Sequence, residues 1–414
     1  MALYPEQYRT RRPANTEKDI LTKRTKRQGK KLFGVSIKNG DQIPEHLIIE
    51  ILSRLPVKAL LQFKSVCKLW YGIIKSSHFI SKHLRNYYDT NNWRDCLIVQ
   101  YSVTQLGKLD VFKLLIDDTK NRAFSYNRID TPFDNSYLCG PCDGMNYVCS
   151  FRSSIPKRSL WNPALNEFKR LPDITCWNPN LATNSAYVYE NGYGFGYDSK
   201  TKDYKVIIIL GYGSPTTKEN SETTDNPKSI LIYSLRTNSW RYWGDMDRSY
   251  NFESNKSYVF VTGCYYWLAS RLLPCGWSFD MIVSFDISAD TCQEIPMPKF
   301  ETRPAYGSQL IVYRDSIAFV SVPKDNTICC VWTWNEGVWT RKFSMKLDSG
   351  VMGAFTLLRD NMLVFSQRYR KLVLCDTNTK EIFVLDDPQA SGCENICAYK
   401  ESLVSIKDFG KNVT

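Results

Sequence analysis

The sequence predicts an α+β multidomain protein, in which a small N-terminal helical module precedes an all-β propeller of about six blades closed by strands from both chain ends. Three observations lead to this fold class. The chain has 414 residues, 43% of them hydrophobic, which exceeds one ordinary domain. Apolar residues recur at three- and four-residue spacing between residues 43 and 84. Beyond residue 90 the apolar period becomes two, within repeated strand–turn–strand segments.

The net charge of +12 is confined to the first 88 residues. Residues 1–40 hold eleven Lys and Arg against three Asp and Glu, and residues 41–88 hold seven against three. The remaining residues carry equal numbers of both signs. The body of the chain therefore has no net basic field, and we expect neither a nucleic-acid partner nor a membrane partner.

Residues 1–40 are polar and basic, which predicts a disordered tail. Within it, Lys23-Arg24-Thr25-Lys26-Arg27 is open to two interpretations, a nuclear import signal or part of a solvated tail. The sequence contains no apolar run typical of a secretory signal or a membrane span. We therefore expect a cytoplasmic or nuclear location, where the fourteen cysteines stay reduced.

The periodicity of residues 41–88 predicts three short helices. Pro44 suits a first helical turn, Pro56 ends the first helix, and Ser76-Ser77 separates the second helix from the third. A unit of this size hides only about 60% of its unfolded surface, so its apolar stripes either dock onto a partner or pack on the chain's own body. The stripes are Leu47, Ile48, Ile51, Leu52 and Leu55, then Leu60, Leu61, Phe63, Val66, Leu69, Trp70, Ile73 and Ile74, then Phe79, Ile80 and Leu84.

This module carries a family resemblance. Ile43-Pro44-Glu45-His46-Leu47, residues 50–58 and residues 60–70 look like a plant F-box, with His46 where members often carry an acid. The resemblance implies binding to the Skp-type adaptor of a cullin ubiquitin ligase and, through it, to cullin and RING subunits. The residues that it assigns to the adaptor interface are Pro44, Leu47, Ile51, Leu52, Leu55, Pro56, Val66 and Trp70.

Five similar hairpins follow the helical module, each with an apolar strand, a small polar turn and a second strand that opens on a bulky residue. Another strand pair precedes each hairpin, which gives four strands per repeat. The turns are marked by Asn162, Ser234, Asp286, Asn335 and Asp376, at steps of 72, 52, 49 and 41 residues. These steps are near the propeller period of about 40 to 50 residues.

Strands left over at both chain ends predict how the propeller is completed. Cys96 to Tyr101, Leu109 to Ile116 and Cys397 to Ile406 are expected to form one last blade, because joining both ends removes exposed sheet edges. We therefore place the propeller at residues 89–408, followed by a tail at residues 409–414.

The same region resembles the kelch-like F-box-associated domain of plant proteins. The motifs that carry the resemblance are Gly140-Pro141-Cys142-Asp143-Gly144, Leu160-Trp161-Asn162-Pro163, Gly194-Phe195-Gly196-Tyr197-Asp198, Asp203-Tyr204-Lys205-Val206 and Tyr399-Lys400-Glu401-Ser402-Leu403. They are also similar to S-locus F-box proteins of pollen, which target secreted ribonucleases of the pistil for ubiquitination in self-incompatibility. The resemblance implies a non-catalytic substrate receptor without a cofactor.

Three motifs with catalytic or metal-binding associations lack the context that their chemistry needs. Cys139-Gly140-Pro141-Cys142 has thioredoxin letters but no following helix, and the glycines of residues 192–196 also lead into a strand. All three histidines lie before residue 84, far in sequence from any close cysteine pair, which disfavours zinc and excludes a propeller-borne histidine base. We expect neither catalytic residues nor a metal.

A binding function therefore remains, and two insertions are candidate binding sites. Residues 213–229 are polar, whereas residues 271–280 carry Leu272, Leu273, Trp277 and Phe279 as an aromatic and aliphatic anchor for a protein substrate. The alternative interpretations are a mobile loop and a partly buried hairpin tip. At the level of function, the alternatives are a glycan- or ligand-binding propeller without ligase coupling and a propeller enzyme.

Overall fold

The computed structural model describes most of the chain from residue 43 to residue 409. The described segments are residues 43–89, 95–103, 108–118, 123–133, 136–150, 156–174, 187–213, 227–246, 250–252, 258–273, 276–299, 308–322, 328–346, 351–358, 361–367, 371–386 and 393–409. The basic segment predicted at residues 1–40 lies outside them. No helix in these segments has both the length and the apolar character that a membrane crossing requires.

The chain divides into two compact units between Leu52 and Ser53. The described part of the first unit contains helix α2 (Glu45–Leu52). Pro44 stands at its start, where its carbonyl oxygen accepts hydrogen bonds from the N–H groups of Leu47 and Ile48 at 2.9 and 3.2 Å. The helix ends four residues before Pro56, earlier than the periodicity predicted, since proline disfavours helical backbone in the residue before it.

The second unit begins with three helices among its described residues: α3 (Val57–Phe63), α4 (Lys68–Lys75) and α5 (Ser77–Asp89). The prediction of one helix across residues 60–74 was wrong. Cys67 interrupts it with extended backbone (φ −159°, ψ 165°), and its Sγ accepts the N–H of Trp70 at 3.5 Å as the N-cap of α4. The predicted break at Ser76 is confirmed, because its Oγ accepts the N–H of Phe79 at 3.1 Å.

Helix α5 packs on the chain's own body, one of the two alternatives that the sequence left open. Ile80 and Leu84 lie against the apolar core that the first strands of the propeller form. Phe79 and His83 are buried, and a ring nitrogen of His83 is 2.9 Å from the carbonyl oxygen of Leu55. Burial lowers the pKa of His83. The third apolar stripe predicted from the sequence, at Phe79, Ile80 and Leu84, therefore packs against the rest of the second unit.

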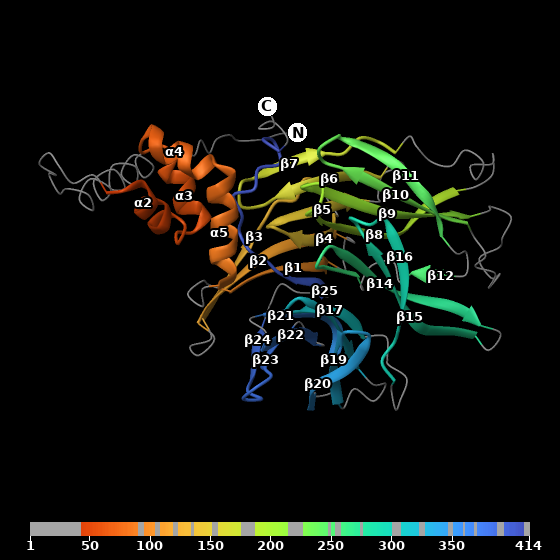
Figure 1. Ribbon diagram of the computed structural model, residues 1–414. Helices are drawn as coiled ribbons and strands as arrows, with labels where there is room; N and C mark the ends of the chain where they lie inside the picture. Colours follow the sequence, from red (N-terminus) through yellow and green to blue (C-terminus); the bar gives the residue numbers. More distant parts are fainter. Residues whose placement is uncertain are drawn as a thin grey trace, which may run out of the picture. The chain divides into compact units, whose positions relative to one another are not determined.

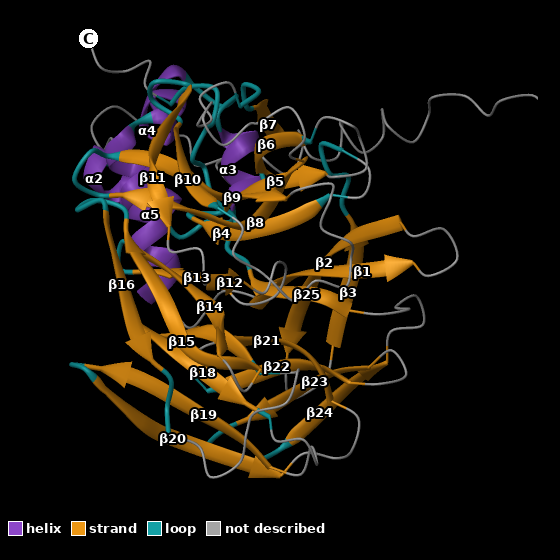
Figure 2. Ribbon diagram, turned by 90° about the vertical axis from the view of Figure 1, so that its right-hand side faces the viewer, coloured by secondary structure: helices purple, strands orange, loops and turns teal. Residues whose placement is uncertain are grey.

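The described strands form antiparallel sheets, which Figures 1 and 2 show as successive layers of ribbon. The first two sheets are β4 (Tyr137–Cys142), β5 (Met145–Ser150), β6 (Lys157–Asn162) and β7 (Glu167–Arg170), and β8 (Tyr187–Asp198), β9 (Asp203–Gly213), β10 (Lys228–Ser234) and β11 (Ser239–Met246). The third consists of β12 (Tyr250–Phe252), β13 (Tyr258–Val261), β14 (Cys264–Leu273), β15 (Gly276–Asp286) and β16 (Thr291–Pro296).

Two further sheets follow in chain order with the same arrangement. They are β17 (Gln309–Tyr313), β18 (Ser316–Ser321), β19 (Ile328–Asn335) and β20 (Val338–Lys346), and β21 (Val351–Leu358), β22 (Met362–Gln367), β23 (Lys371–Asp376) and β24 (Ile382–Asp386). These two sheets and the first two are paired in sequence order, as hairpins require, whereas in the third sheet β12 and β13 both pair with β14. A mostly β propeller body after N-terminal helices is thus confirmed.

One more sheet combines strands from distant parts of the chain, in the order β25 (Cys393–Ala398), β1 (Asp95–Val103), β2 (Lys108–Asp118) and β3 (Ala123–Arg128). Leu97 pairs with Ala398 and Val99 with Ile396. The C-terminal strand was predicted at Cys397 to Ile406, but it lies at Cys393–Ala398. The apolar residues after Ala398 are buried without joining a sheet.

Apolar side chains between neighbouring sheets make the core, as binary patterning requires. Tyr147 of β5 and Phe195 of β8 belong to one such cluster, in which Phe409 also packs. The ring of Phe409 lies 5.2 Å from that of Tyr204, so the packed body extends past the boundary predicted at residue 408. Close approach depends on small residues, because a Cβ on Gly194 would lie 2.4 Å from the Tyr265 ring.

Candidate functional site

Helix α2 presents an apolar stripe to solvent. Leu47 and Ile51 of α2 are four residues apart, which places them on one side of the helix, and they are 45% and 56% exposed; Ile43, two residues before the helix, is 46% exposed. Leu52, which the sequence assigned to the same interface, is 1% exposed. Its side chain is core, so Leu52 does not offer the surface that was expected of it.

A second apolar patch surrounds the start of α4. Val66, Leu69 and Tyr71 are all about half exposed, whereas Trp70 is half-buried with its ring 5.3 Å from that of Phe63. Of the other predicted residues, Pro44 and Pro56 are exposed and Leu55 is half-buried. The predicted set of adaptor-binding residues did not include Ile43, Leu69 and Tyr71. Ile43 and Leu69 nevertheless lie within the sequence motifs on which that prediction was based.

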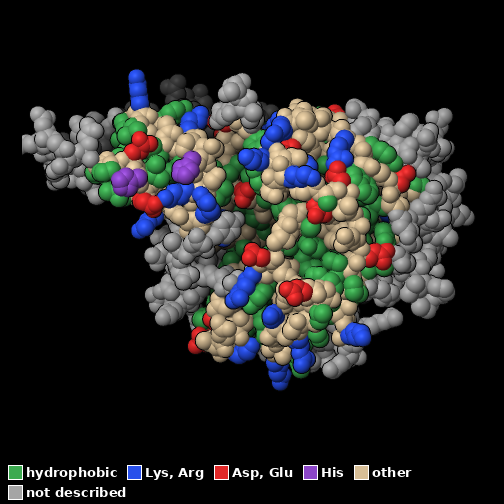
Figure 3. Space-filling view, in the orientation of Figure 1, with side chains coloured by type: hydrophobic (Ala, Val, Ile, Leu, Met, Phe, Trp, Pro, Cys, Tyr) green, Lys and Arg blue, Asp and Glu red, His purple; other side chains and the backbone are tan. Residues whose placement is uncertain are grey.

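Basic side chains border this second patch. Arg54, Lys58 and Lys68 are exposed, and Lys75 lies over the ring of Tyr71 at 5.4 Å. Burial lowers the pKa of Lys64, and the positive charge of Lys75 lowers it further. Over the rest of the face in Figure 3, Lys and Arg alternate with Asp and Glu. The positive charge of the described residues therefore gathers at the helices, which matches the sequence count.

One end of the sheets is built from tight turns. Where the third strand of a sheet ends, a polar side chain accepts the following backbone N–H groups: Asp286 Oδ1 accepts from Ser288 and Ala289, both at 2.8 Å. Asn162 and Asp376 do the same in their sheets. Four residues after Asn162, Ser234, Asp286 and Asp376 the backbone φ is positive, at Asn166, Asn238, Asp290 and Lys380. These four polar residues, which marked the repeats in the sequence, therefore begin turns of the same type.

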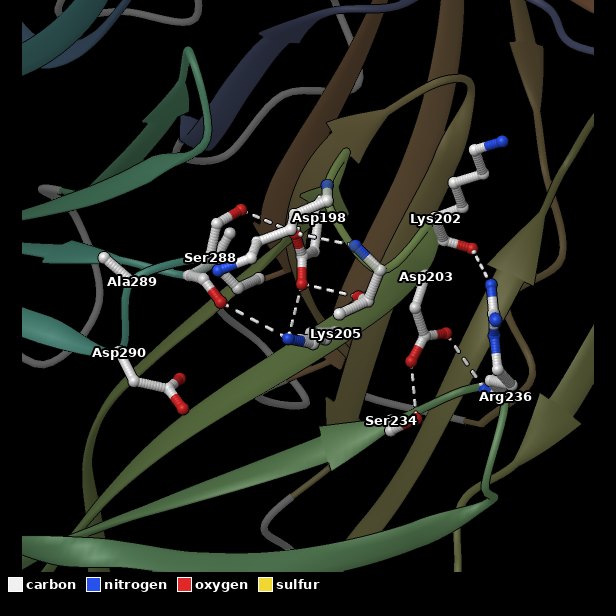
Figure 4. Close-up of polar contacts among 12 residues, drawn as sticks. Asp198, Lys202, Asp203, Lys205, Ser234, Arg236, Ser288, Ala289 and Asp290 are labelled. Atoms are coloured by element: carbon white, nitrogen blue, oxygen red, sulfur yellow. Dashed lines mark hydrogen bonds and ion pairs between the residues drawn. The ribbon is translucent and has the colours of Figure 1, made fainter.

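The turns are also joined from sheet to sheet, as Figure 4 shows. Asp198, at the end of β8, accepts hydrogen bonds from Lys205 Nζ at 2.6 Å and from Ser288 Oγ of the next sheet at 2.5 Å. Lys205 Nζ also donates to the carbonyl oxygen of Ile287 at 3.3 Å. Burial disfavours the charged form of Asp198, but these donors outweigh it and lower its pKa. These contacts therefore join two neighbouring sheets at the end that carries the tight turns.

The opposite end of the sheets carries the longer connections. In an up-and-down antiparallel sheet the connections alternate ends, so those between second and third strands, and those between sheets, share this end. The connections at residues 171–186 and from Gly213 to Lys228 lie here. Both insertions that the sequence singled out join second and third strands. They therefore leave the molecule at one end, away from the tight turns.

The predicted anchor at residues 271–280 is a hairpin rather than an irregular loop. Leu272 pairs with Trp277 and Leu273 with Gly276, which extends β14 and β15 beyond their neighbours. The side chains of Leu272, Leu273, Trp277 and Phe279 lie outside the described part of the structure. Their assignment to a substrate therefore stays a prediction.

Inner strands of three sheets meet at one carbonyl group. The carbonyl oxygen of Leu138 on β4 accepts a hydrogen bond from Tyr258 Oη of β13 at 2.7 Å and one from Asn395 Nδ2 of β25 at 3.2 Å. Nearby, Trp267 Nε1 donates to the carbonyl oxygen of Tyr193 at 3.0 Å. These bonds cross-link sheets that are far apart in the sequence.

The comparisons with known protein families agree with this geometry. A model described as the F-box domain matches residues 41–82, which hold the exposed stripe of α2 and the patch at α4. A model described as the F-box associated beta propeller domain matches residues 111–406, more than half of the chain. The chain belongs to the F-box-associated β-propeller family. The family resemblance read from the motifs is thus confirmed.

Curated relatives align with most of this F-box propeller. F-box protein CPR1 of Arabidopsis thaliana is 24% identical over 355 residues, which cover 82% of this chain and 81% of that protein. F-box/kelch-repeat protein At3g23880 of the same plant is 25% identical over 375 residues, 89% of this chain and 96% of that protein. F-box/WD-40 repeat-containing protein 1 is 25% identical over 347 residues, 81% and 76% respectively.

The redox-like and nucleotide-like motifs of this F-box propeller are structural. Cys139 and Cys142 lie on β4, where burial raises the pKa of both thiols, so neither is the activated thiolate of a redox site. The glycines at residues 192–196 lie within β8 and pair with β9. A helix N-terminus, which a dinucleotide phosphate needs, does not follow them.

A buried ion pair joins the first two sheets of the propeller. Arg158 of β6 and Glu190 of β8 are 7% and 3% exposed, and Arg158 Nε donates to Glu190 Oε1 at 2.8 Å. Burial raises the pKa of Glu190, against the opposing effect of the Arg158 guanidinium. No motif in the sequence signalled this pair, because its members lie in strands of different sheets.

Proposed function

We propose that this chain is the substrate receptor of a Skp–cullin–F-box ubiquitin ligase and has no catalytic activity of its own. The exposed apolar stripe of α2, within the residues that the F-box model matches, is the observation that supports it most. A half-exposed Leu or Ile that becomes buried contributes about 1 kcal/mol to binding. A helix surface of this kind fits a groove on a helical partner, here the Skp-type adaptor.

The adaptor interface that we propose comprises both apolar surfaces. It contains Pro44, Leu47, Ile51, Leu55, Pro56, Val66 and Trp70 from the sequence prediction, without the buried Leu52, and adds Ile43, Leu69 and Tyr71. The bordering Lys and Arg side chains favour an adaptor with an acidic rim, because complementary charge accelerates encounter.

The substrate, we propose, binds at the end of the sheets that carries the long connections. Loops held by a rigid scaffold are suited to recognition, and the tight turns occupy the other end. A protein bound there would be held close to the ligase, and effective concentration would promote ubiquitin transfer to its lysines. The hairpin with Leu272, Leu273, Trp277 and Phe279 belongs to this end.

For the propeller itself we propose about six blades, the last one closed by strands from both chain ends. Pairing of β1 with β25 supports closure, because it leaves neither strand with a free edge on that side. A closed body resists local opening, as a platform for a bound substrate requires.

The finer assignment, also a proposal, is an S-locus-like receptor for secreted ribonucleases of the pistil, acting in the cytoplasm or nucleus. It rests on motif similarity alone. Affinity purification from the native tissue with the proteasome inhibited tests it: a pistil ribonuclease beside the adaptor supports it, and a different substrate set rejects it while keeping the ligase.

Adaptor binding tests the proposed function directly. The full chain with Leu47→Asp and Ile51→Asp should lose binding to a purified Skp-type adaptor by at least about a hundredfold, since two apolar anchors become charged. His46→Asp, on the exposed surface of the same helix, is the matched control and should bind normally. Adaptor binding that survives the double substitution, or a wild-type chain that does not bind, would overturn the proposal.

A further inference from the structure

The segment after β25, residues 399–409, crosses the tight-turn end of the molecule as a strap. It begins where the N–H of Tyr399 donates to the carbonyl oxygen of Cys96 at 2.8 Å. It contains no strand, yet Leu403 and Ile406 are buried and Ser402 is fully buried. Its path therefore depends on side chains from other elements.

Asn162 and Glu167, at the turn between β6 and β7, hold the middle of the strap. Asn162 Nδ2 donates to the carbonyl oxygens of Ser402 and Val404 at 3.2 and 2.8 Å. Glu167 Oε2 accepts from Ser405 Oγ at 2.9 Å and from the N–H groups of Ile406 and Lys407 at 3.0 and 3.5 Å. One carboxylate oxygen thus fixes three successive residues.

Close packing leaves the strap no room to shift. A Cβ on Gly144, in the turn between β4 and β5, would lie 2.4 Å from the Cβ of Ser402, and the positive φ of Gly144 (74°) also favours glycine. At the far end Phe409 packs edge-on against Tyr204 of β9. The strap therefore spans from the sheet of β25 across the first sheet to the second.

The helices are tied to the same strap. Lys75, the last residue of α4, forms an ion pair with Asp408 at 3.2 Å. A hydrogen bond with Tyr71, and then Asp408, raises the pKa of Lys75. The charges of Glu167 and Asp408 both oppose the lowering of the pKa of Lys64, the residue that follows α3.

From these contacts we propose that residues 399–409 are a positioning brace, which sets the orientation of α4 relative to the sheets. This inference rests on the proposed function for its purpose: under that proposal α4 contacts the adaptor and the substrate binds at the loop end of the sheets, so the brace fixes how the patch at α4 is oriented relative to the bound substrate.

The test uses the full chain with two weakening substitutions. Glu167→Ala removes the acceptor for three hydrogen bonds, and Asp408→Lys places two like charges together. Glu167→Gln, which keeps an acceptor oxygen, and the charge swap Lys75→Asp with Asp408→Lys are the rescue variants. Asp173→Ala is the matched control, because it removes an exposed carboxylate that pairs only locally with Arg170 at 3.8 Å.

Two readouts separate the brace from the proposed function. Probes at exposed Gly72 on α4 and at exposed Val338, the first residue of β20, report an intramolecular distance distribution, which should broaden in both weakened variants and stay narrow in the control and the rescues. In the reconstituted ligase, self-ubiquitination by the Glu167→Ala variant should fall roughly tenfold at unchanged adaptor affinity, since Glu167 lies outside the proposed adaptor interface.

The brace and the proposed function predict different experimental outcomes. An unchanged distance distribution in both weakened variants overturns the brace, whatever the ligase assay gives. A broadened distribution with unchanged ubiquitination overturns the purpose that we assign to it. A wild-type chain that binds no adaptor removes the proposed function while the distance measurement still decides whether the strap orients the helices.

Discussion

Asp198 shows how a single side chain joins two sheets. Its buried carboxylate, at the end of β8, accepts hydrogen bonds from Lys205 of its own sheet and Ser288 of the next. Hydrogen bonds to a charged group contribute about 1.5 to 3 kcal/mol each, more than neutral ones. The motif Gly194 to Asp198 was conspicuous in the sequence, but the partner Ser288 lies 90 residues away and no local pattern marks it.

The depressed pKa of Asp198 predicts a pH dependence of stability. The stabilisation is fully present above the unfolded-state pKa of about 4 and is lost as the pH falls through the lower folded-state pKa. Asp198→Asn should lower the free energy of unfolding at pH 7 by about 2 kcal/mol, and should lessen the loss below pH 4. Urea unfolding between pH 7 and pH 2 measures both. A mutant curve parallel to the wild-type curve would contradict the assignment.

The pair of Arg158 and Glu190 predicts an asymmetric response to substitution. Glu190→Leu leaves the buried Arg158 without its counter-charge and should destabilise the chain by about 3 to 5 kcal/mol, whereas Arg158→Met combined with Glu190→Leu should recover most of that loss. A double-mutant cycle by chemical denaturation gives the two values. Equal destabilisation of the single and double variants would show that the charge is not the cause.

At the scale of elements, periodicity predicted the existence of helices and strands better than their ends. The five turn residues from Asn162 to Asp376 were recognisable, because polar side chains that bond to their own backbone leave a repeated composition. The break before α4 was missed, since apolar spacing continues across it and cysteine is an uncommon cap. The strap was taken for a strand, because its apolar residues Leu403, Val404 and Ile406 are of types that are also common in strands.

The weak cap at Cys67 predicts a gain in stability. A thiol is a poor acceptor, and its contact with the Trp70 N–H is 3.5 Å long, so Cys67→Ser should stabilise the chain by about 0.5 to 1 kcal/mol. Cys67→Ala, which removes the acceptor, should not. Thermal unfolding of the two variants measures the difference, and an equal effect of both would exclude capping as its origin.

The position of Gly194 predicts how well the contact between its sheet and the next sheet accommodates an added methyl group. Gly194→Ala would place a Cβ 2.4 Å from the Tyr265 ring and should cost about 1 to 3 kcal/mol. Gly244→Ala is the matched control on β11, where an added Cβ would meet nothing within 4 Å. Urea midpoints of both variants test this. The same midpoint for both would mean that the sheets can move apart at no cost.

At the scale of the whole molecule, the sequence predicted the order of the parts and the family, but not which surfaces are free. Leu52 and Ile51 are neighbours in one apolar stripe, yet the first is buried and the second exposed. Periodicity cannot separate core from interface, because both require the same apolar side chains. The segregation of tight turns and long connections to opposite ends becomes apparent only when the strand pairing is known.

The proposed closure of the propeller by β1 and β25 predicts where an added charge destabilises the sheets. Ile396→Asp, buried on β25 against the core of Leu97 and Val99, should expose sheet edges and cause aggregation on mild heating. The same substitution at Ile382, 45% exposed on β24, is the control and should remain monomeric. Light scattering during a temperature ramp distinguishes them. Equal behaviour would show that β25 does not secure the closure.

Tight turns and long connections lie at opposite ends of the sheets, so the two can change independently. Under the proposed function, this separation affects how substrate receptors diversify. A change in the length or composition of the connections at 171–186 or 214–227 leaves the turns of Asn162 and Asp198 in place. New specificities can therefore be sampled by insertion and deletion without a compensating change at the adaptor surface. Under the proposed function, a binding loop grafted at that end is expected to direct degradation to a chosen protein.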